Sequence, residues 1–290
     1  MAEIYGLDVS HHNGLINWVK VARAGRTFAL FKCQYESASH RKDETFDYNY
    51  QEAGRCGLAR GVYIYLAKEA IDNPKKDAES LLKNLGGRKL ELGIWLDLED
   101  KVIGALGKER IKNISKIYID IFKKAGYKVG IYCNLDWYKR LIHDELKNNY
   151  KLWIARYPKG DNGSYNPATA LKPEDKNIVM RQYSSKGKID GIKGNVDLNV
   201  MYDNTFIEGA KPQKSTNPFI LKADLLKIGS RGDSVKWLQF ELNRHGASLV
   251  IDGVFGNATK NALVKFQNSH KLVPDGIFGI KTKKAIFDLL

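Results

Sequence analysis

The chain has 290 residues, of which 43% are hydrophobic and 28% are charged, so it can bury a full core and is too apolar to be a disordered chain. Its three cysteines show no metal-binding spacing and leave one thiol unpaired in any disulfide scheme, which excludes a disulfide scaffold and favours reduced thiols made in a cytoplasm. The formal net charge of +14 favours a polyanionic partner, which could be nucleic acid, an anionic membrane surface or an acidic cell wall.

The first residues enter strand-like sequence at once, from Ile4. They lack the basic region and long apolar stretch of a secretory signal, and no later run approaches the length needed to span a membrane. We therefore expect synthesis in a cytoplasm without a signal peptide, and no membrane insertion.

Strand-like and helix-like segments alternate through the first 160 residues. A helix is predicted over 74–85, with proline near its start, another around 111–122, ended by Ala125-Gly126, and a third near 137–146. The predicted strands are 4–9, 28–33, 61–66, 94–99, 129–133 and 151–155. This alternation predicts a parallel β/α barrel.

The alternation lapses after residue 175. Segments 178–183 and 196–202 flank a turn rich in glycine and lysine, which predicts a hairpin that closes the barrel. The fold class is therefore α/β, an irregular (β/α) barrel of the TIM type, with a catalytic domain over residues 1–207.

A linker is predicted over 208–219, where apolar periodicity is lost, followed by a small three-helix domain over 220–290. The latter contains an internal repeat, Asp252-Gly-Val-Phe-Gly256 and Asp275-Gly-Ile-Phe-Gly279, in which each Asp-Gly can form a tight turn before a helix. Residues 211–290 carry 13 Lys and Arg against 6 Asp and Glu, so the C-terminal segment is densely basic.

Carboxylates occur in three separate strand-like segments. Asp97 and Glu99 alternate within the run 94–99 and should point to the same side, while Asp8 ends the first strand and Asp197 lies in the last. Neighbouring carboxyl groups raise one another's pKa, as a general acid near neutral pH requires. Catalytic groups of parallel barrels lie at the carboxyl ends of strands, so this pattern predicts cleavage of a glycosidic bond.

A saccharide groove needs aromatic platforms, because sugar rings present apolar C–H faces. The candidates are Tyr63, Tyr65, Tyr132, Trp153, Tyr157 and Tyr183. For each of them core or rim packing is the alternative, since barrel strands use aromatic residues freely. His11 and His12 lack partners at ligand spacing, so we expect loop or hydrogen-bonding roles, no metal site and no cofactor.

The first domain resembles the family-25 glycoside hydrolases, the Chalaropsis-type lysozymes. The motifs that carry the resemblance are Gly6-Leu7-Asp8-Val9-Ser10, Asn13-Gly14, Gly61-Val62-Tyr63-Ile64-Tyr65, Leu96-Asp97-Leu98-Glu99, Trp153-Ile154-Ala155-Arg156-Tyr157, Gln182-Tyr183 and Val196-Asp197-Leu198-Asn199. The C-terminal domain resembles the type-1 peptidoglycan-binding domain, through Gly229-Ser-Arg-Gly232, Leu238-Gln239, Phe266-Gln267 and the two repeats. Together they resemble a phage endolysin.

The resemblance implies an N-acetylmuramidase that hydrolyses the β-1,4 bond between N-acetylmuramic acid and N-acetylglucosamine in the peptidoglycan of Gram-positive bacteria. Glu99 would protonate the leaving oxygen, Asp97 would orient the substrate's 2-acetamido group, and Asp8 and Asp197 would complete an acidic floor. A competing assignment makes one aspartate a covalent nucleophile or a base for water. Gln182 joins the tyrosines and Trp153 as a residue implied to bind substrate.

Other functions remain open at this stage. They are a bacterial autolysin, an endo-β-N-acetylglucosaminidase or family-18-like chitinase, and a non-catalytic wall-binding protein. Trp95 stands where the family-18 pattern has a further aspartate, which argues against a chitinase, and no recognised nucleic-acid motif supports a nucleic-acid binder. The expected partners are bacterial peptidoglycan, anionic wall polymers and, for release to the wall, a separate holin-like protein.

Overall fold

The chain divides into two compact units, Met1–Lys214 and Ser215–Leu290. The structure, a computed structural model, describes residues 3–167, 177–203, 217–219 and 221–288, with the backbone alone at 287 and 288. Most of the predicted linker, 208–219, lies outside the described residues. None of the helices described is both long and apolar enough to cross a lipid bilayer.

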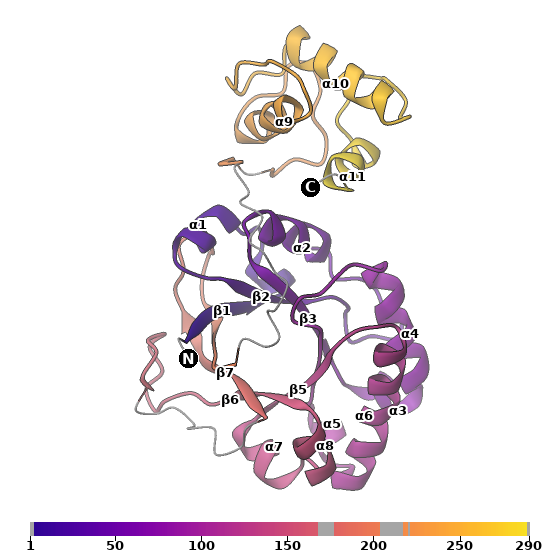
Figure 1. Cartoon of the computed structure of the whole chain (residues 1–290), viewed down its shortest axis with the longest axis vertical. Coiled ribbons are helices and arrows are strands. Elements are labelled where there is room, and N and C mark those ends of the chain that lie inside the picture. The colour runs from indigo at the N-terminus through magenta and orange to yellow at the C-terminus, as the bar shows by residue number, and fades with distance from the viewer. Residues whose placement is uncertain (1–2, 168–176, 204–216, 220, 289–290) are drawn as a thin grey trace. The chain divides into compact units, whose positions relative to one another are not determined.

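The first unit is a closed barrel in which the strands follow one another in chain order (Figure 1). The strands are β1 (Ile4–Val9), β2 (Phe28–Lys32), β3 (Ala59–Tyr65), β4 (Ile94–Asp97), β5 (Val129–Asn134), β6 (Lys151–Ala155), β7 (Ile178–Gly187) and β8 (Val196–Met201). Neighbours from β1 to β7 are parallel, whereas β8 is antiparallel to both β7 and β1. The predicted irregular barrel with a closing hairpin is confirmed.

Helices surround the ring of strands (Figure 1). They are α1 (Trp18–Arg23), α2 (Phe46–Arg55), α3 (Lys68–Asp72), α4 (Pro74–Leu85), α5 (Lys101–Gly104), α6 (Gly107–Lys124), α7 (Leu135–Arg140) and α8 (Asp144–Asn149), with a short 3-10 turn, η1 (His11–Asn13), after β1. Helix α4 has the predicted bounds, because Pro74 occupies its first turn, Asn73 caps its start and Gly86 ends it in a left-handed conformation.

The prediction of one helix near 137–146 is wrong. The chain forms α7 and α8 there, separated at 141–143. The ring of His143 accepts a hydrogen bond from the backbone N–H of Glu145 at 3.1 Å, so His143 caps a new helix instead of continuing the first. Apolar spacing alone could not show this break.

Side-chain alternation divides each strand between two cores. Residues such as Leu7, Leu96 and Ile131 point outward and pack under the helices. Their neighbours Trp95 and Trp153 point inward and fill the barrel with other large side chains. Because alternate residues share a face, the inward row that contains Trp95 ends in Asp97 at the mouth of the barrel.

The second unit contains α9 (Asp233–Arg244), α10 (Asn257–Ser269) and α11 (Ile280–Asp288) among its described residues. It has a hydrophobic core of its own, in which Trp237, Phe255 and Phe278 are the largest side chains. The predicted helical character of this unit is confirmed.

We expect Gly130→Ala to destabilise the barrel by about 1–3 kcal/mol, because a Cβ on this β5 residue would overlap the indole ring of Trp95. Thermal unfolding followed by circular dichroism measures the loss. A double-mutant cycle with Trp95→Phe provides the control, since the smaller ring leaves room for the methyl group and the two effects should not be additive. Additive losses would show that the clash with Trp95 is not the cause.

Candidate active site

The four predicted acids meet at one mouth of the barrel. Asp8 lies near the end of β1, Asp97 is the last residue of β4, and Glu99 follows two residues later. Asp197 is the second residue of β8, and because β8 runs in the opposite direction its beginning lies where the other strands end. The register pairs Asp8 directly with Asp197.

Asp8 is held by two buried amides. Its Oδ1 accepts hydrogen bonds from Gln182 Nε2 at 2.9 Å and from Asn199 Nδ2 at 2.7 Å. Asn199 is oriented in turn by Trp153, whose indole N–H donates to Asn199 Oδ1 at 2.8 Å. This chain of donors gives Asp8 one orientation in the mouth.

Gln182 also connects the acids to the tyrosines. Its Oε1 accepts hydrogen bonds from the hydroxyl groups of Tyr132 at 2.8 Å and Tyr157 at 2.6 Å. The Tyr132 ring centroid lies 4.4 Å from that of Trp153, so both rings are held in place by packing as well as by hydrogen bonds. The wall of the mouth is therefore a connected polar and aromatic network.

Asp97 has a different environment from Asp8. It is buried, and its Oδ1 has no hydrogen-bond partner within the described part of the chain. Burial, followed by the negative charges of Glu99 and Asp8, raises its pKa well above the ordinary value, while the ammonium group of Lys32 acts in the opposite direction. Asp97 thus keeps a buried carboxyl oxygen without a hydrogen-bond partner.

The other three carboxyl groups also hold their protons more tightly than usual. Burial raises the pKa of Asp8, and burial together with the charge of Asp8 raises the pKa values of Glu99 and Asp197. Glu99 is the one of the four whose side chain is exposed to solvent. Because carboxylates this close repel one another as anions, some of these carboxyl groups stay protonated toward neutral pH. A general acid must be protonated at the pH at which it works.

The predicted sugar platforms do not all lie together. Tyr63 and Tyr132 lie among the acids, and burial followed by the negative charge of a nearby aspartate raises the pKa of both hydroxyls. Tyr157 is 42% exposed and can meet a ligand, whereas Trp153 is only 2% exposed and supports the rings above it. Tyr65 donates a hydrogen bond to Asp100 Oδ2 at 3.2 Å, beside Glu99.

Tyr183 is not brought together with these residues. It alternates with Gln182 along β7, so it points outward into the core beneath the helices, where its ring centroid lies 5.1 Å from that of Tyr165. Its neighbour Gln182 points inward and is buried at 3% exposure, in the network that holds Asp8.

Two residues of the mouth were missed by sequence reasoning. Lys32 is a buried lysine at the end of β2, with its Nζ 2.6 Å from Glu36 Oε2, and Asn199 orients Asp8. A signal was present for both, because a lysine or asparagine inside an apolar barrel strand requires a polar partner. That signal does not identify which residue is the polar partner.

The paired histidines lie in the turn after β1. His11 Nδ1 is 2.7 Å from Asp43 Oδ2, and the His11 ring centroid lies 4.6 Å from that of Tyr35. This contact ties the turn that follows Asp8 to the loop between β2 and α2. No group of three or more potential ligands that could hold a metal ion occurs among the residues that the structure describes.

Residues 7–192 match the sequence model of glycosyl hydrolases family 25, and this match covers more than half of the chain. The chain belongs to that family. Residues 231–286 match the model of a putative peptidoglycan binding domain. The protein is therefore a glycoside hydrolase of the lysozyme family, and peptidoglycan is its partner.

Relatives and solved structures agree with this membership. The autolytic lysozyme of Clostridium acetobutylicum is 27% identical over 268 residues, which cover 91% of this chain and 72% of that protein. The modular autolysin LytC from Streptococcus pneumoniae, solved with a synthetic peptidoglycan ligand, is 25% identical with a TM-score of 0.57, over 69% of this chain and 47% of that one. The CTP1L endolysin, at 24% identity and a TM-score of 0.56 over 70% of this chain and 67% of that one, shares the fold.

We expect Asp97→Asn to raise the melting temperature of this family-25 protein at neutral pH. The folded-state pKa of Asp97 is raised, so its stabilising contribution is complete below the ordinary pKa of 3.8 and is lost as the pH rises through the folded value. Asparagine carries no charge, so the difference between variant and wild type should be near zero at pH 4 and grow toward neutral pH. A gain of about 1 kcal/mol corresponds to roughly 2–4 °C for a domain of this size.

Differential scanning calorimetry at several pH values measures this difference. Asp190→Asn is the matched control, because the Asp190 side chain is 70% exposed and its neutralisation should shift the melting temperature little at any pH. A variant at Asp97 that is less stable than the wild type at pH 7 would contradict the expectation.

Proposed function

We propose that the chain is an endolysin-type N-acetylmuramidase that hydrolyses the β-1,4 bond between N-acetylmuramic acid and N-acetylglucosamine in Gram-positive peptidoglycan. The observation that carries the proposal is the pair Asp97 and Glu99 at the mouth of a closed barrel, where burial and nearby carboxylates raise the pKa of both and where Asp8 and Asp197 also lie. Membership of family 25 limits the reaction to glycoside hydrolysis.

Glu99 is the proposed general acid. Its exposed position gives a polymer access, and its raised pKa keeps the carboxyl group protonated at higher pH than usual. Glu99 donates its proton to the glycosidic oxygen as the bond from that oxygen to C1 breaks. The oxygen of the substrate's 2-acetamido group bonds to C1 from the other face, and water later opens this ring while Glu99 takes back a proton.

Asp97 is the proposed partner of the acetamido group. Its unpartnered Oδ1 can accept the acetamido N–H, which orients the acetamido oxygen toward C1 and stabilises the positive charge that develops on the ring. Lys32 and Tyr63 interact electrostatically with Asp97, but neither donates a hydrogen bond to its Oδ1. Asp8 and Asp197 would form the acidic floor of the mouth.

Substrate contacts are proposed for the residues that line this mouth. Tyr157, Tyr132 and Tyr63 would meet sugar rings, with Gln182 holding two of the hydroxyls and Trp153 supporting the rings from below. Tyr65 would contact the ligand near Glu99, through its position beside Asp100.

The second unit would hold the enzyme on the wall. Its excess of lysine and arginine suits anionic polymers of Gram-positive walls, in addition to peptidoglycan itself. An enzyme joined to such a unit is the arrangement of endolysins, which act at the wall after a separate holin-like protein opens the membrane. The autolytic lysozyme that matches both units favours a second candidate, an autolysin of the bacterium itself.

We expect Glu99→Gln to lower wall hydrolysis by about 10²- to 10⁴-fold, because glutamine has no proton to donate to the leaving oxygen. Purified Gram-positive peptidoglycan is digested, the new ends are reduced with borohydride, and the terminal sugar is identified by mass spectrometry. Glu79→Gln, on the exposed surface of α4, is the control and should retain activity.

Reduced muramic ends made by the wild type alone support the muramidase. Reduced glucosamine ends would show that the enzyme is a glucosaminidase instead of a muramidase. Full activity of Glu99→Gln would exclude Glu99 as the general acid. Expression inside a Gram-positive bacterium, with and without a pore-forming protein, tests the endolysin role. Lysis without that protein would favour the autolysin.

A further inference from the structure

The second unit repeats one hydrogen-bonded device at two places. In the first repeat Gln239 Nε2 donates to Asp252 Oδ1 at 2.7 Å and to Thr259 Oγ1 at 3.1 Å, and Gln239 Oε1 accepts from the backbone N–H of Gly253 at 2.9 Å. These contacts fix the loop between α9 and α10. We call this device the glutamine clasp.

The second repeat contains the same clasp. Gln267 Nε2 donates to Asp275 Oδ1 at 2.9 Å and to Thr282 Oγ1 at 3.0 Å, and Gln267 Oε1 accepts from Gly276 at 2.9 Å. Because the same contacts fold both loops, the clasp accounts for the fold of each repeat. A residue that differs between the two repeats outside the clasp is therefore not explained by the folding of the loop.

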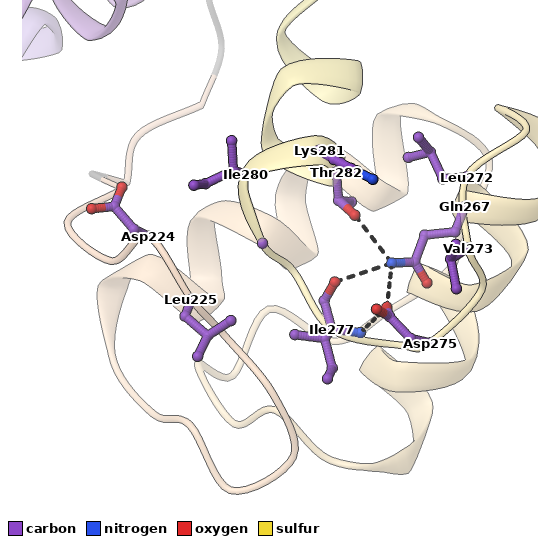
Figure 2. A pocket seen from close by; sticks show the side chains of 11 residues that line it. Asp224, Leu225, Gln267, Leu272, Val273, Asp275, Ile277, Ile280, Lys281 and Thr282 are labelled. Atoms are coloured by element: carbon purple, nitrogen blue, oxygen red, sulfur yellow. Dashed lines mark hydrogen bonds between the residues drawn. The ribbon is translucent and has the colours of Figure 1, made fainter.

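The second clasp lies at the base of a cavity of about 440 Å³, within the usual size of small-ligand clefts of roughly 300–1,000 Å³. Figure 2 shows Asp224 and Leu225 on one side of it and Leu272 and Val273 on the other, with Ile277 and Ile280 between them. All of these residues belong to the second unit.

Large apolar side chains are exposed around this cavity. Ile280 is 80% exposed, Val273 70%, Leu225 56% and Ile277 37%. These are four of the ten large hydrophobic side chains that are exposed in the part of the chain that the structure describes, so they concentrate at one groove instead of scattering over the surface.

The internal repeat shows that an isoleucine and a lysine at the start of the helix are not needed for folding. Both α10 and α11 begin at the second residue after the clasp's Gly-x-Phe, and where the second repeat has Ile280 and Lys281 the first has Asn257 and Ala258. The second repeat therefore has an exposed isoleucine and a lysine at positions where asparagine and alanine support the same fold in the first repeat. The replacement points to a ligand.

The chemistry of the groove selects the part of peptidoglycan that fits. None of its lining residues is aromatic, so it lacks the platform that a sugar ring favours. Its walls are aliphatic and its rim carries the carboxylates of Asp224 and Asp275, of which Asp224 already lies 2.7 Å from Lys283 Nζ. Lys281 has no acidic partner among the described residues. Asp275 Oδ2 likewise makes no hydrogen bond there, and hydrogen bonds from Ile277 N and Gln267 lower the pKa of Asp275 so that it stays ionised.

We propose that this groove, lined by Leu225, Val273, Ile277 and Ile280, binds the stem peptide of peptidoglycan rather than its glycan. The alanine methyl groups of the peptide match the aliphatic walls, the ammonium group of its diamino acid matches Asp275, and a peptide carboxylate matches Lys281. The proposal rests on the proposed wall-degrading function, since it names the part of the wall that the second unit holds.

The test uses the full chain and two soluble probes. One is the synthetic pentapeptide L-Ala-γ-D-Glu-L-Lys-D-Ala-D-Ala, and the other is a glycan strand from which the peptides have been removed. Isothermal titration calorimetry measures the binding of each. To keep the glycan intact, its titration is made with Glu99→Gln.

Two variants give the groove the residues of the first repeat. Ile280→Asn and Lys281→Ala should each weaken binding of the pentapeptide by about tenfold or more. Both variants should fold, because Asn257 and Ala258 occupy the same positions at the start of α10. Val250→Asn removes an equally exposed aliphatic side chain of the first repeat, outside the groove, and should leave binding unchanged.

The outcomes separate this proposal from the function of the barrel. Pentapeptide binding that Ile280→Asn leaves unchanged, or binding of the bare glycan with no binding of the pentapeptide, would overturn the groove proposal even if wall hydrolysis is normal. Conversely, if the pentapeptide binds and no new reducing ends form on the wall, the proposed hydrolase function fails while the groove proposal stands.

Discussion

Four carboxyl groups crowded into the mouth of one closed barrel are the constraint on which the rest of the structure depends. They cannot all ionise in such a space, since burial raises the pKa of every one of them and repulsion by neighbouring carboxylates raises those of Asp97, Glu99 and Asp197 further. The surrounding network decides how each responds. Asp8 receives two amide donors, whereas Asp97 keeps a buried oxygen without a partner.

The antiparallel strand β8 makes this crowding possible. A barrel of parallel strands places only strand ends at its catalytic mouth, but β8 runs the other way and brings the residues at its beginning there. Asp197 thereby faces Asp8, and Asn199 reaches it one inward position further along. The departure from a regular barrel thus supplies both a fourth acid and the amide that orients the first.

The two units use polarity in opposite ways. In the barrel, buried polar groups are satisfied by one another at the mouth and leave one acceptor open, as a site for chemistry requires. In the second unit, the glutamine clasps hold the loops by hydrogen bonds, and the open feature is an apolar groove with charges at its rim. The first arrangement suits bond breaking, and the second suits retention of a ligand without chemistry.

The sequence by itself determined the barrel, the closing hairpin, the clustering of the acids and the repeat of the second unit, because each depends on local alternation, spacing or motif. Helix α4 followed from Pro74 near its start, and the inward row of Trp95 and Asp97 followed from strand parity. Only the tertiary structure decided the roles of Lys32 and Asn199, the outward position of Tyr183 and the break between α7 and α8. The reason is physical: a residue's own segment sets the face on which it lies, but its partners come from strands far away in the chain, and those meet only when the barrel closes.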